Sequence, residues 1–240
     1  MNQLVKIKEF LLDILFPPLC LNCSSSLQEK EKTSALCGRC REKITVHTTL
    51  FCSVCRARLP DNKKTCHKNS SYLLGAATNY DEVIKSIIHR FKYKFWTRLE
   101  NPLSDLLLTY TKNLSPDGLL FKNYTVIPVP LHKNREQERG FNQSERLAKI
   151  IAIRYHLPME IKALSREKET KPQAELKNWE ERKTNLAKSF VVANPTAVKG
   201  KNIILIDDVY TSGATINEAV QSLRSAGARK IIALVLAKTK

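Results

Sequence analysis

The chain has 240 residues, of which 42% are hydrophobic and 26% are charged, and its formal net charge at pH 7 is +17. This composition is ordinary for a globular protein large enough to bury a core without disulfides, and no apolar run approaches the roughly 20 residues of a transmembrane helix. The positive charge favours a polyanionic partner, such as nucleic acid, or an anionic substrate, although a general bias toward basic residues gives the same number.

Residues 1–18 are predicted to form an N-terminal amphipathic helix that ends at Pro17 and Pro18. Charges at Lys6, Glu9 and Asp13 interrupt its apolar residues, which argues against a secretory signal peptide. Its apolar face could dock on the rest of the protein, which we favour, on a partner, or on a membrane surface. The protein is therefore predicted to be cytoplasmic, at most peripheral to the inner face of the membrane.

All seven cysteines lie between residues 20 and 66, which predicts a zinc-ribbon module over residues 19–70. Two pairs, each with two intervening residues, can present four thiolates to one tetrahedral ion. Such a site is structural rather than catalytic, because it leaves no open coordination position. Disulfides are disfavoured, because they need an oxidising compartment. The predicted ligands of the first zinc are Cys20, Cys23, Cys37 and Cys40.

The second zinc site is less complete, because a fourth cysteine pair would need another cysteine near Asn69. His67 is a candidate for the missing ligand, yet neighbouring residues seldom aim both side chains at one metal. His47 or water could replace it, and loss of the second metal is a further alternative. The candidate set for the second zinc is Cys52, Cys55, Cys66 and His67.

The composition changes after residue 70, and residues 71–240 are predicted to form a second domain. Residues 72–80 are predicted to form a strand, followed by a helix from about residue 81 and another over about residues 99–108.

The segment 89–98 alternates basic and aromatic residues. Stacking aromatics among cations suit single-stranded nucleic acid, with Lys92, Lys94 and Arg98 as the candidate contacts. The alternative, which we favour, is that the aromatic residues Phe91, Phe95 and Trp96 pack in the core while the cations face solvent.

Residues 124–130 are predicted to be the first buried strand of an α/β core, ended by its prolines. The loop behind it, residues 131–140, carries Lys133, Arg135 and Arg139. At the carboxyl end of a strand these cations could hold a pyrophosphate, and Arg135 and Arg139 are the candidates.

The remaining elements alternate between helix and strand. A helix is predicted over residues 141–155, a short strand near residues 161–164, and further strands over residues 190–192 and 231–236. The polar stretch 165–183 fits either a mobile loop over an active site or a merely exposed loop. Strands alternating with helices predict a doubly wound parallel sheet flanked by helices, an α/β fold.

The strongest local signal begins with four apolar residues, Ile203 to Ile206, which predict a buried central strand. Asp207 and Asp208 follow at its carboxyl end, where open α/β sheets bind ligands. A turn rich in hydroxyls then precedes an amphipathic helix that stops at Gly227, so backbone N–H groups and the helix dipole can hold a phosphate. Carboxylates accept hydrogen bonds from vicinal hydroxyls, so the implied ligand is a sugar phosphate. The candidate phosphate-binding residues are Thr211, Ser212, Gly213, Ala214 and Thr215.

This stretch closely resembles the 5-phosphoribosyl-1-pyrophosphate (PRPP) loop of type I phosphoribosyltransferases. The chain as a whole resembles the ComF family of competence-associated proteins, in which a cysteine-rich double zinc ribbon precedes a phosphoribosyltransferase-like domain. The likeness covers nearly the full length. The matching segments are Leu15 to Cys20, Pro128 to Pro130, Arg139 to Gln143, Arg166 with Thr170, Gln173, Arg182 and Asn185, and the loop that begins at Asp207.

The resemblance implies that PRPP or a ribose 5-phosphate ligand binds with Mg²⁺, and that zinc is structural. Asp207 and Asp208 would act at the ribose as catalytic residues, and Arg135 and Arg139 would hold the pyrophosphate. It further implies a role beside the DNA-uptake machinery, in uptake or processing of single-stranded DNA during natural transformation. The alternative is an active phosphoribosyltransferase, a glycosyltransferase acting on an unidentified nitrogen acceptor.

Overall fold

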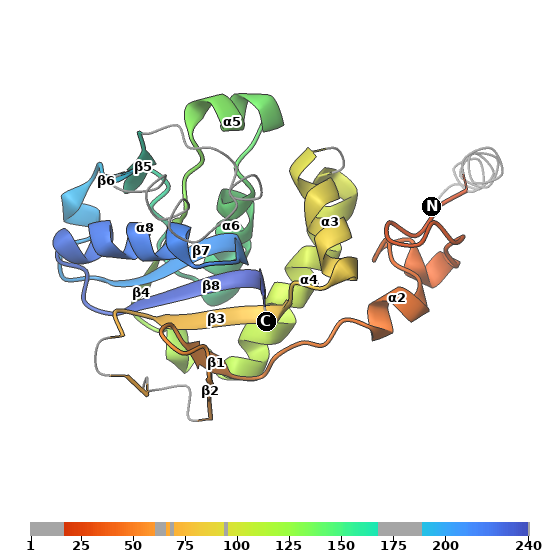
Figure 1. Ribbon diagram of the computed structural model, residues 1–240, viewed down its shortest axis with the longest axis horizontal. Coiled ribbons are helices and arrows are strands. Elements are labelled where there is room, and N and C mark those ends of the chain that lie inside the picture. The colour runs from red at the N-terminus through yellow and green to blue at the C-terminus, as the bar shows by residue number, and fades with distance from the viewer. Residues whose placement is uncertain (1–16, 61–65, 68–69, 94–95, 168–188, 240) are drawn as a thin grey trace. The chain divides into compact units, whose positions relative to one another are not determined.

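The computed structural model describes residues 17–60, 66–67, 70–93, 96–167 and 189–239 (Figure 1). Contacts divide the chain into two compact units, residues 1–45 with 81–103 and residues 46–80 with 104–240. The domain boundary predicted after residue 70 stays a prediction. In chain order, the helices and strands are α2 (Gly38–Glu42), β1 (Leu50–Cys52), β2 (Arg58–Leu59), β3 (Leu73–Asn79), α3 (Glu82–Tyr93), α4 (Trp96–Leu114), β4 (Tyr124–Pro128), α5 (Lys133–Arg139), α6 (Gln143–Tyr155), β5 (Leu164–Arg166), β6 (Phe190–Val192), β7 (Asn202–Tyr210), α8 (Ala214–Ser225) and β8 (Ile231–Lys238).

In the part of the chain that the structure describes, six strands form one mixed sheet in the order β2-β1-β3-β8-β7-β4. The strands β3, β8, β7 and β4 run parallel, which confirms the α/β core. The hairpin β1-β2 comes from the cysteine-rich segment and pairs antiparallel with β3. The second cysteine cluster is therefore built on the edge of the same sheet that carries Asp207 and Asp208.

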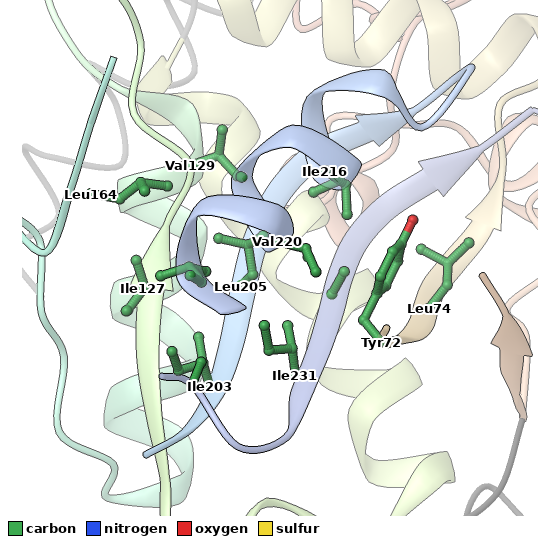
Figure 2. Close-up of a cluster of buried hydrophobic side chains, with 14 of the residues drawn as sticks. Tyr72, Leu74, Ile127, Val129, Leu164, Ile203, Leu205, Ile216, Val220 and Ile231 are labelled. Carbon is green, nitrogen blue, oxygen red and sulfur yellow. The ribbon is translucent and has the colours of Figure 1, made fainter. Parts of the chain in front are cut away.

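Apolar side chains of β7 and β8 form the centre of the second unit, because both strands have neighbours on either side. Ile203 and Leu205 of β7 pack with Ile216 and Val220 of α8 on one face (Figure 2). Since side chains alternate along a strand, Ile204 and Ile206 point to the other face. There α6 packs against β4 and β7. The buried run predicted from the sequence thus has a helix on each side.

Phe190–Val192 was predicted to belong to the parallel sheet, and this is wrong. These residues form β6, which pairs antiparallel with β5 in a separate two-stranded sheet. Phe190 is buried but Val191 is 40% exposed. A strand that is covered on both faces of a sheet is normally a longer apolar run. In contrast, β6 has only three residues, and its central side chain is exposed. The strand predicted near residues 161–164 lies slightly later, at Leu164–Arg166.

Three other boundaries differ from the prediction. Residues 133–139 form the helix α5 rather than a loop, because good helix formers stand between a His132 cap and Gly140, whose φ is +75°. The helix predicted over residues 99–108 spans Trp96–Leu114, since its buried positions continue to Leu114. The strand predicted over residues 203–206 continues to Tyr210, because β7 pairs with β8 up to Lys238.

Candidate functional site

The two acids lie in the last part of β7, where Asp207 is half-buried and Asp208 is buried. One oxygen of Asp207, Oδ1, accepts hydrogen bonds from the Ser144 hydroxyl at 2.9 Å and from the backbone N–H of Asp208 at 2.9 Å. These two bonds fix the orientation of the carboxylate. Ser144 was not singled out in the sequence, because the contact joins residues that are 63 positions apart.

Ser144 reaches Asp207 because a side-chain cap shapes the start of α6. The side-chain oxygen of Asn142, Oδ1, accepts from the Ser144 N–H at 3.0 Å. The side-chain amide nitrogen of Asn142, Nδ2, donates to the Val129 carbonyl at 3.1 Å. Asn142, Gln143 and Ser144 are all buried. The capping residue therefore ties α6 to the end of β4 and places the serine hydroxyl beside the acids.

The turn between β7 and α8 holds the candidate phosphate-binding residues. Gly213 stands at the N-cap of α8 with φ of +83°, a left-handed conformation that favours glycine. The Ser212 hydroxyl accepts from the Ala214 N–H at 3.3 Å. The 12-residue α8 begins at Ala214, directly after the turn that follows β7, so the positive end of its dipole faces this turn.

Arg166 is an arginine within electrostatic range of Asp207. Burial of Arg166, together with the positive charge of Arg135, lowers the pKa of the Arg166 guanidinium to about 10, and Asp207 opposes this shift. Arg166 also lies over the Phe190 ring, 5.3 Å from its centroid. Arg166 therefore lies within electrostatic range of both Arg135 and Asp207. Arg166 belongs to the polar segment of the family resemblance, a signal that could have marked it as a site residue.

Arg139 lies near the start of α6, where its guanidinium donates to the side-chain oxygen of Gln143 at 3.1 Å. Gln143 is 1% exposed, and its amide nitrogen has no hydrogen-bond partner among the described residues. A buried donor of this kind normally finds an acceptor, so an anionic ligand near Arg139 would meet a ready donor.

The first cysteine cluster brings four sulfur atoms together. The ligand atoms of Cys20, Cys23, Cys37 and Cys40 lie within 4.8 Å of one another. The Ser25 hydroxyl and backbone lower the pKa of Cys23 to about 6, whereas burial raises the pKa of Cys40 to about 12. The donor chemistry fits zinc, which binds four thiolates tetrahedrally and offsets the cost of ionising a buried one.

In the second cluster the ligand atoms of Cys52, Cys55, Cys66 and His67 also lie within 4.8 Å of one another. Nδ1 of His67 is 3.2 Å from the Cys66 sulfur and 3.5 Å from the Cys52 sulfur. Three thiolates and an imidazole fit a structural zinc. His47 does not join the group, because it is buried with Nδ1 bonded to the Ala76 carbonyl at 2.9 Å. Adjacent residues Cys66 and His67 thus do face one centre.

The candidate nucleic-acid segment is only partly described. Phe91 is buried and Lys92 is half-buried, as expected if the aromatic residues of this segment pack inward. Lys94, Phe95 and the side chains of Trp96 and Arg98 lie outside the described part. None of the described helices combines the length and the apolar character that a membrane span requires.

Comparison with known proteins finds two domains. The double zinc ribbon domain matches residues 11–71, and the phosphoribosyl transferase domain matches residues 139–240. The chain is 33% identical to competence protein ComFC of Bacillus subtilis (strain 168) over 213 residues, which cover 87% of this chain and 79% of that protein. It is 28% identical to the DNA utilization protein YhgH of Escherichia coli (strain K12) over 217 residues, or 90% of each chain.

A solved structure is also similar. It is the glutamine PRPP amidotransferase of B. subtilis complexed with ADP and GMP, at 19% identity and a TM-score of 0.36. That similarity covers 55% of this chain and 25% of the other.

Proposed function

Because the chain belongs to the ComF family, whose members combine a double zinc ribbon with a phosphoribosyltransferase-like domain, we propose that it binds PRPP or ribose 5-phosphate with Mg²⁺ and assists uptake or processing of single-stranded DNA in natural transformation. The observation that best supports this ligand is the pair Asp207 and Asp208 near the end of β7, just before the turn that leads into α8. The names of the relatives, competence protein and DNA utilization protein, support the DNA role.

Each part of the ligand has a matching set of residues. Asp207 and Asp208 accept hydrogen bonds from the ribose hydroxyls, and residues 211–215 hold the 5-phosphate. Arg135 and Arg139 hold the pyrophosphate, with Arg166 as a further cation beside Asp207. Carboxylate and phosphate oxygens are the hard ligands that Mg²⁺ prefers, and the ion neutralises the charge of the pyrophosphate.

PRPP with Mg²⁺ is expected to stabilise the protein. At a ligand concentration 100-fold above the dissociation constant the gain is about 2.7 kcal/mol, which raises the melting temperature by about 5–10 °C. The double variant Asp207→Asn with Asp208→Asn is expected to lose this shift, because it keeps the side-chain size but removes both charges. Differential scanning fluorimetry measures both.

Asp105→Asn is the matched control, since Asp105 is an exposed acid on α4. It should keep the full shift. If millimolar PRPP does not shift the melting temperature of wild type, the proposal that this protein binds PRPP is wrong. An equal shift in the double variant would remove the two acids from the site.

Transfer to an acceptor is the alternative function. A nitrogen nucleophile would attack C1 of the ribose while the bond from C1 to the pyrophosphate oxygen breaks, and the nitrogen would lose its proton. The acids would stabilise the positive charge that develops on the ribose. Pyrophosphate release, measured over a panel of bases and amines, separates an enzyme from a binding protein.

Binding of single-stranded DNA is expected to depend on salt, because cations that contact phosphates release counterions. Replacing Lys92, Lys94 and Arg98 by alanine should weaken binding. It should also make the negative slope of log K against log salt shallower by about 2. A labelled oligonucleotide titrated at several salt concentrations gives this slope. The control replaces the exposed residues Lys149, Arg154 and Lys162, which removes the same charges elsewhere. Equal effects of the two triple variants would contradict a contact at residues 92–98.

A further inference from the structure

Arg56 directly follows the cysteine pair of the second cluster, and the hairpin turn fixes its backbone. Its N–H donates to the Cys52 carbonyl at 2.9 Å, and the Cys52 N–H donates to the Ala57 carbonyl at 2.9 Å. Its φ is +62°, a left-handed conformation that is unfavourable for a residue with a side chain. A conformation that costs energy persists only where its surroundings determine it. A metal held by Cys52 and Cys55 would impose this turn.

The Arg56 side chain extends to the turn that we assign to the 5-phosphate. Its Nη2 donates to the Ser212 carbonyl at 3.5 Å, a contact between residues 156 positions apart. The guanidinium also lies over the Tyr210 ring, 5.5 Å from the centroid. Arg56 therefore makes two contacts just before the N-terminus of α8. One is with the backbone of the turn at Ser212, and the other is with the ring of Tyr210, the last residue of β7.

The Tyr210 side chain packs directly against Gly213. A Cβ atom at Gly213 would lie 2.3 Å from the Tyr210 hydroxyl oxygen, so the turn rests directly on this side chain. The Tyr72 hydroxyl lies 3.1 Å from the Tyr210 hydroxyl and donates to the Asn217 side-chain oxygen at 2.6 Å. Burial raises the pKa of Tyr72, which keeps this hydroxyl protonated and able to donate. Tyr210 is thus held by Tyr72 on one side and by Arg56 on another.

The second cluster connects to Tyr72 as well. The Ser53 and Ser70 hydroxyls are 2.7 Å apart, and Ser70 donates to the Tyr72 carbonyl at 2.8 Å. Ser53 lies within the Cys52–Cys55 pair. The cysteine knuckle therefore reaches the phosphate-binding turn along two paths, one through Arg56 and one through Tyr72.

We propose that Arg56 is a positioning residue for the phosphate-binding turn, so that a metal at the second cysteine cluster and a sugar phosphate at residues 211–215 strengthen each other's binding. The ligand part rests on the proposed function. Metal at Cys52, Cys55, Cys66 and His67 rigidifies the knuckle, the knuckle presents Arg56, and Arg56 holds Tyr210 and Ser212 in the conformation that accepts phosphate. Coupling between two binding sites is reciprocal by thermodynamic linkage.

Arg56 also contributes to the potential around the turn. Lys238 lies at the end of β8, where burial and then the charges of Arg56 and Arg58 lower its pKa. Thr239, the next residue, donates its hydroxyl to the Thr211 carbonyl at 3.1 Å. Arg56 and the end of β8 therefore both lie against the turn, and the positive charge of Arg56 favours an anion there.

Hydrogen exchange of the full-length, zinc-loaded protein tests the positioning role without any ligand. Arg56→Gly removes the side chain and suits the left-handed backbone, so the fold is preserved. We expect amides of residues 212–215 to exchange about threefold to tenfold faster in this variant, in line with couplings of this kind. Arg58→Ala, which removes the same charge from the same hairpin, should leave this exchange unchanged. Equal exchange in wild type and Arg56→Gly would overturn the proposal.

The metal dependence is tested with Cys55→Ser, which weakens the second site. If the metal acts through Arg56, combining this change with Arg56→Gly should accelerate exchange no more than either change alone. Additive effects would refute that route. Should Cys55→Ser not fold, removal of the metal by a chelator from wild type and from Arg56→Gly provides the same comparison.

Titration with ribose 5-phosphate adds the ligand side. Arg56→Gly should bind it about threefold to tenfold more weakly than wild type and Arg58→Ala. Saturating ribose 5-phosphate should slow zinc release to a colorimetric chelator in wild type and Arg58→Ala, but not in Arg56→Gly. If wild type binds neither ribose 5-phosphate nor PRPP, the proposed function fails, while the exchange data still decide the role of Arg56. If wild type binds it and Arg56→Gly binds equally well, the function stands and the coupling is refuted.

Discussion

Gly213→Ala is expected to lower the free energy of unfolding by about 2–4 kcal/mol and to abolish binding of PRPP. The left-handed φ of +83° accounts for about 1 kcal/mol of this loss. The rest comes from overpacking, because the new Cβ would lie 2.3 Å from the Tyr210 hydroxyl oxygen and 2.6 Å from its Cζ. Tyr210 is buried and its hydroxyl meets Tyr72, so the ring has little room to move. Denaturant unfolding measures the loss.

Two other glycines separate the two contributions. Gly140 and Gly200 have φ values of +75° and +72°, and a Cβ at either would meet nothing within 4 Å. Alanine there should cost only the backbone conformation, about 1 kcal/mol. If Gly213→Ala were no more destabilising than these two variants, the turn would not rest on Tyr210 as the structure indicates.

Cys40→Ala is expected to remove one zinc ion and to unfold the first ribbon. Among the described residues 17–45, regular structure amounts to short helical turns and an isolated bridge between Leu19 and Ser26. A segment of this size cannot bury enough apolar surface to stay folded unaided. Structural zinc in small ribbons supplies an apparent free energy of about 10 kcal/mol or more. Cys40 is 4% exposed, so its loss removes a ligand at the buried side of the site.

Zinc content, measured by mass spectrometry of the intact protein, should fall by one equivalent relative to wild type. Limited proteolysis should cut within residues 17–45 of the variant at concentrations of protease that spare wild type. Arg39→Ala is the control, because Arg39 is exposed in the same helix α2 and offers no ligand atom. A Cys40→Ala protein with unchanged zinc content would exclude the four-cysteine assignment.

Contiguous features could be predicted from the sequence. The acids, the candidate phosphate-binding turn and α8 follow one another along the chain, and so their relation depends on local geometry. The paired spacing of Cys20 with Cys23 and of Cys37 with Cys40 is likewise local, and the structure brings these sulfur atoms together. Elements with one strong pattern, such as the apolar run at Ile203, therefore needed no knowledge of the rest of the chain.

Features that depend on pairing were harder to predict. Phe190–Val192 has the composition of a core strand, but its partner turned out to be β5 and not the main sheet. Cys66 and His67 are adjacent, and whether both face one centre depends on how this part of the chain packs against Cys52 of β1 and Cys55. Composition alone carries no information on such pairings, because hydrogen bonds between strands join residues far apart in the chain.

The amino-acid sequence by itself determined the family, the α/β core, the cysteine pairs and the order of acid, hydroxyl and glycine around Asp207. These depend on residue type and on spacing within a short segment. Only the tertiary structure decided that Ser144 orients Asp207, that Arg166 stands beside it, and that Arg56 reaches Ser212 from the second cysteine cluster. Such contacts arise when packing of apolar faces brings distant strand ends to one edge of a sheet, and polar side chains there find partners that no local pattern specifies.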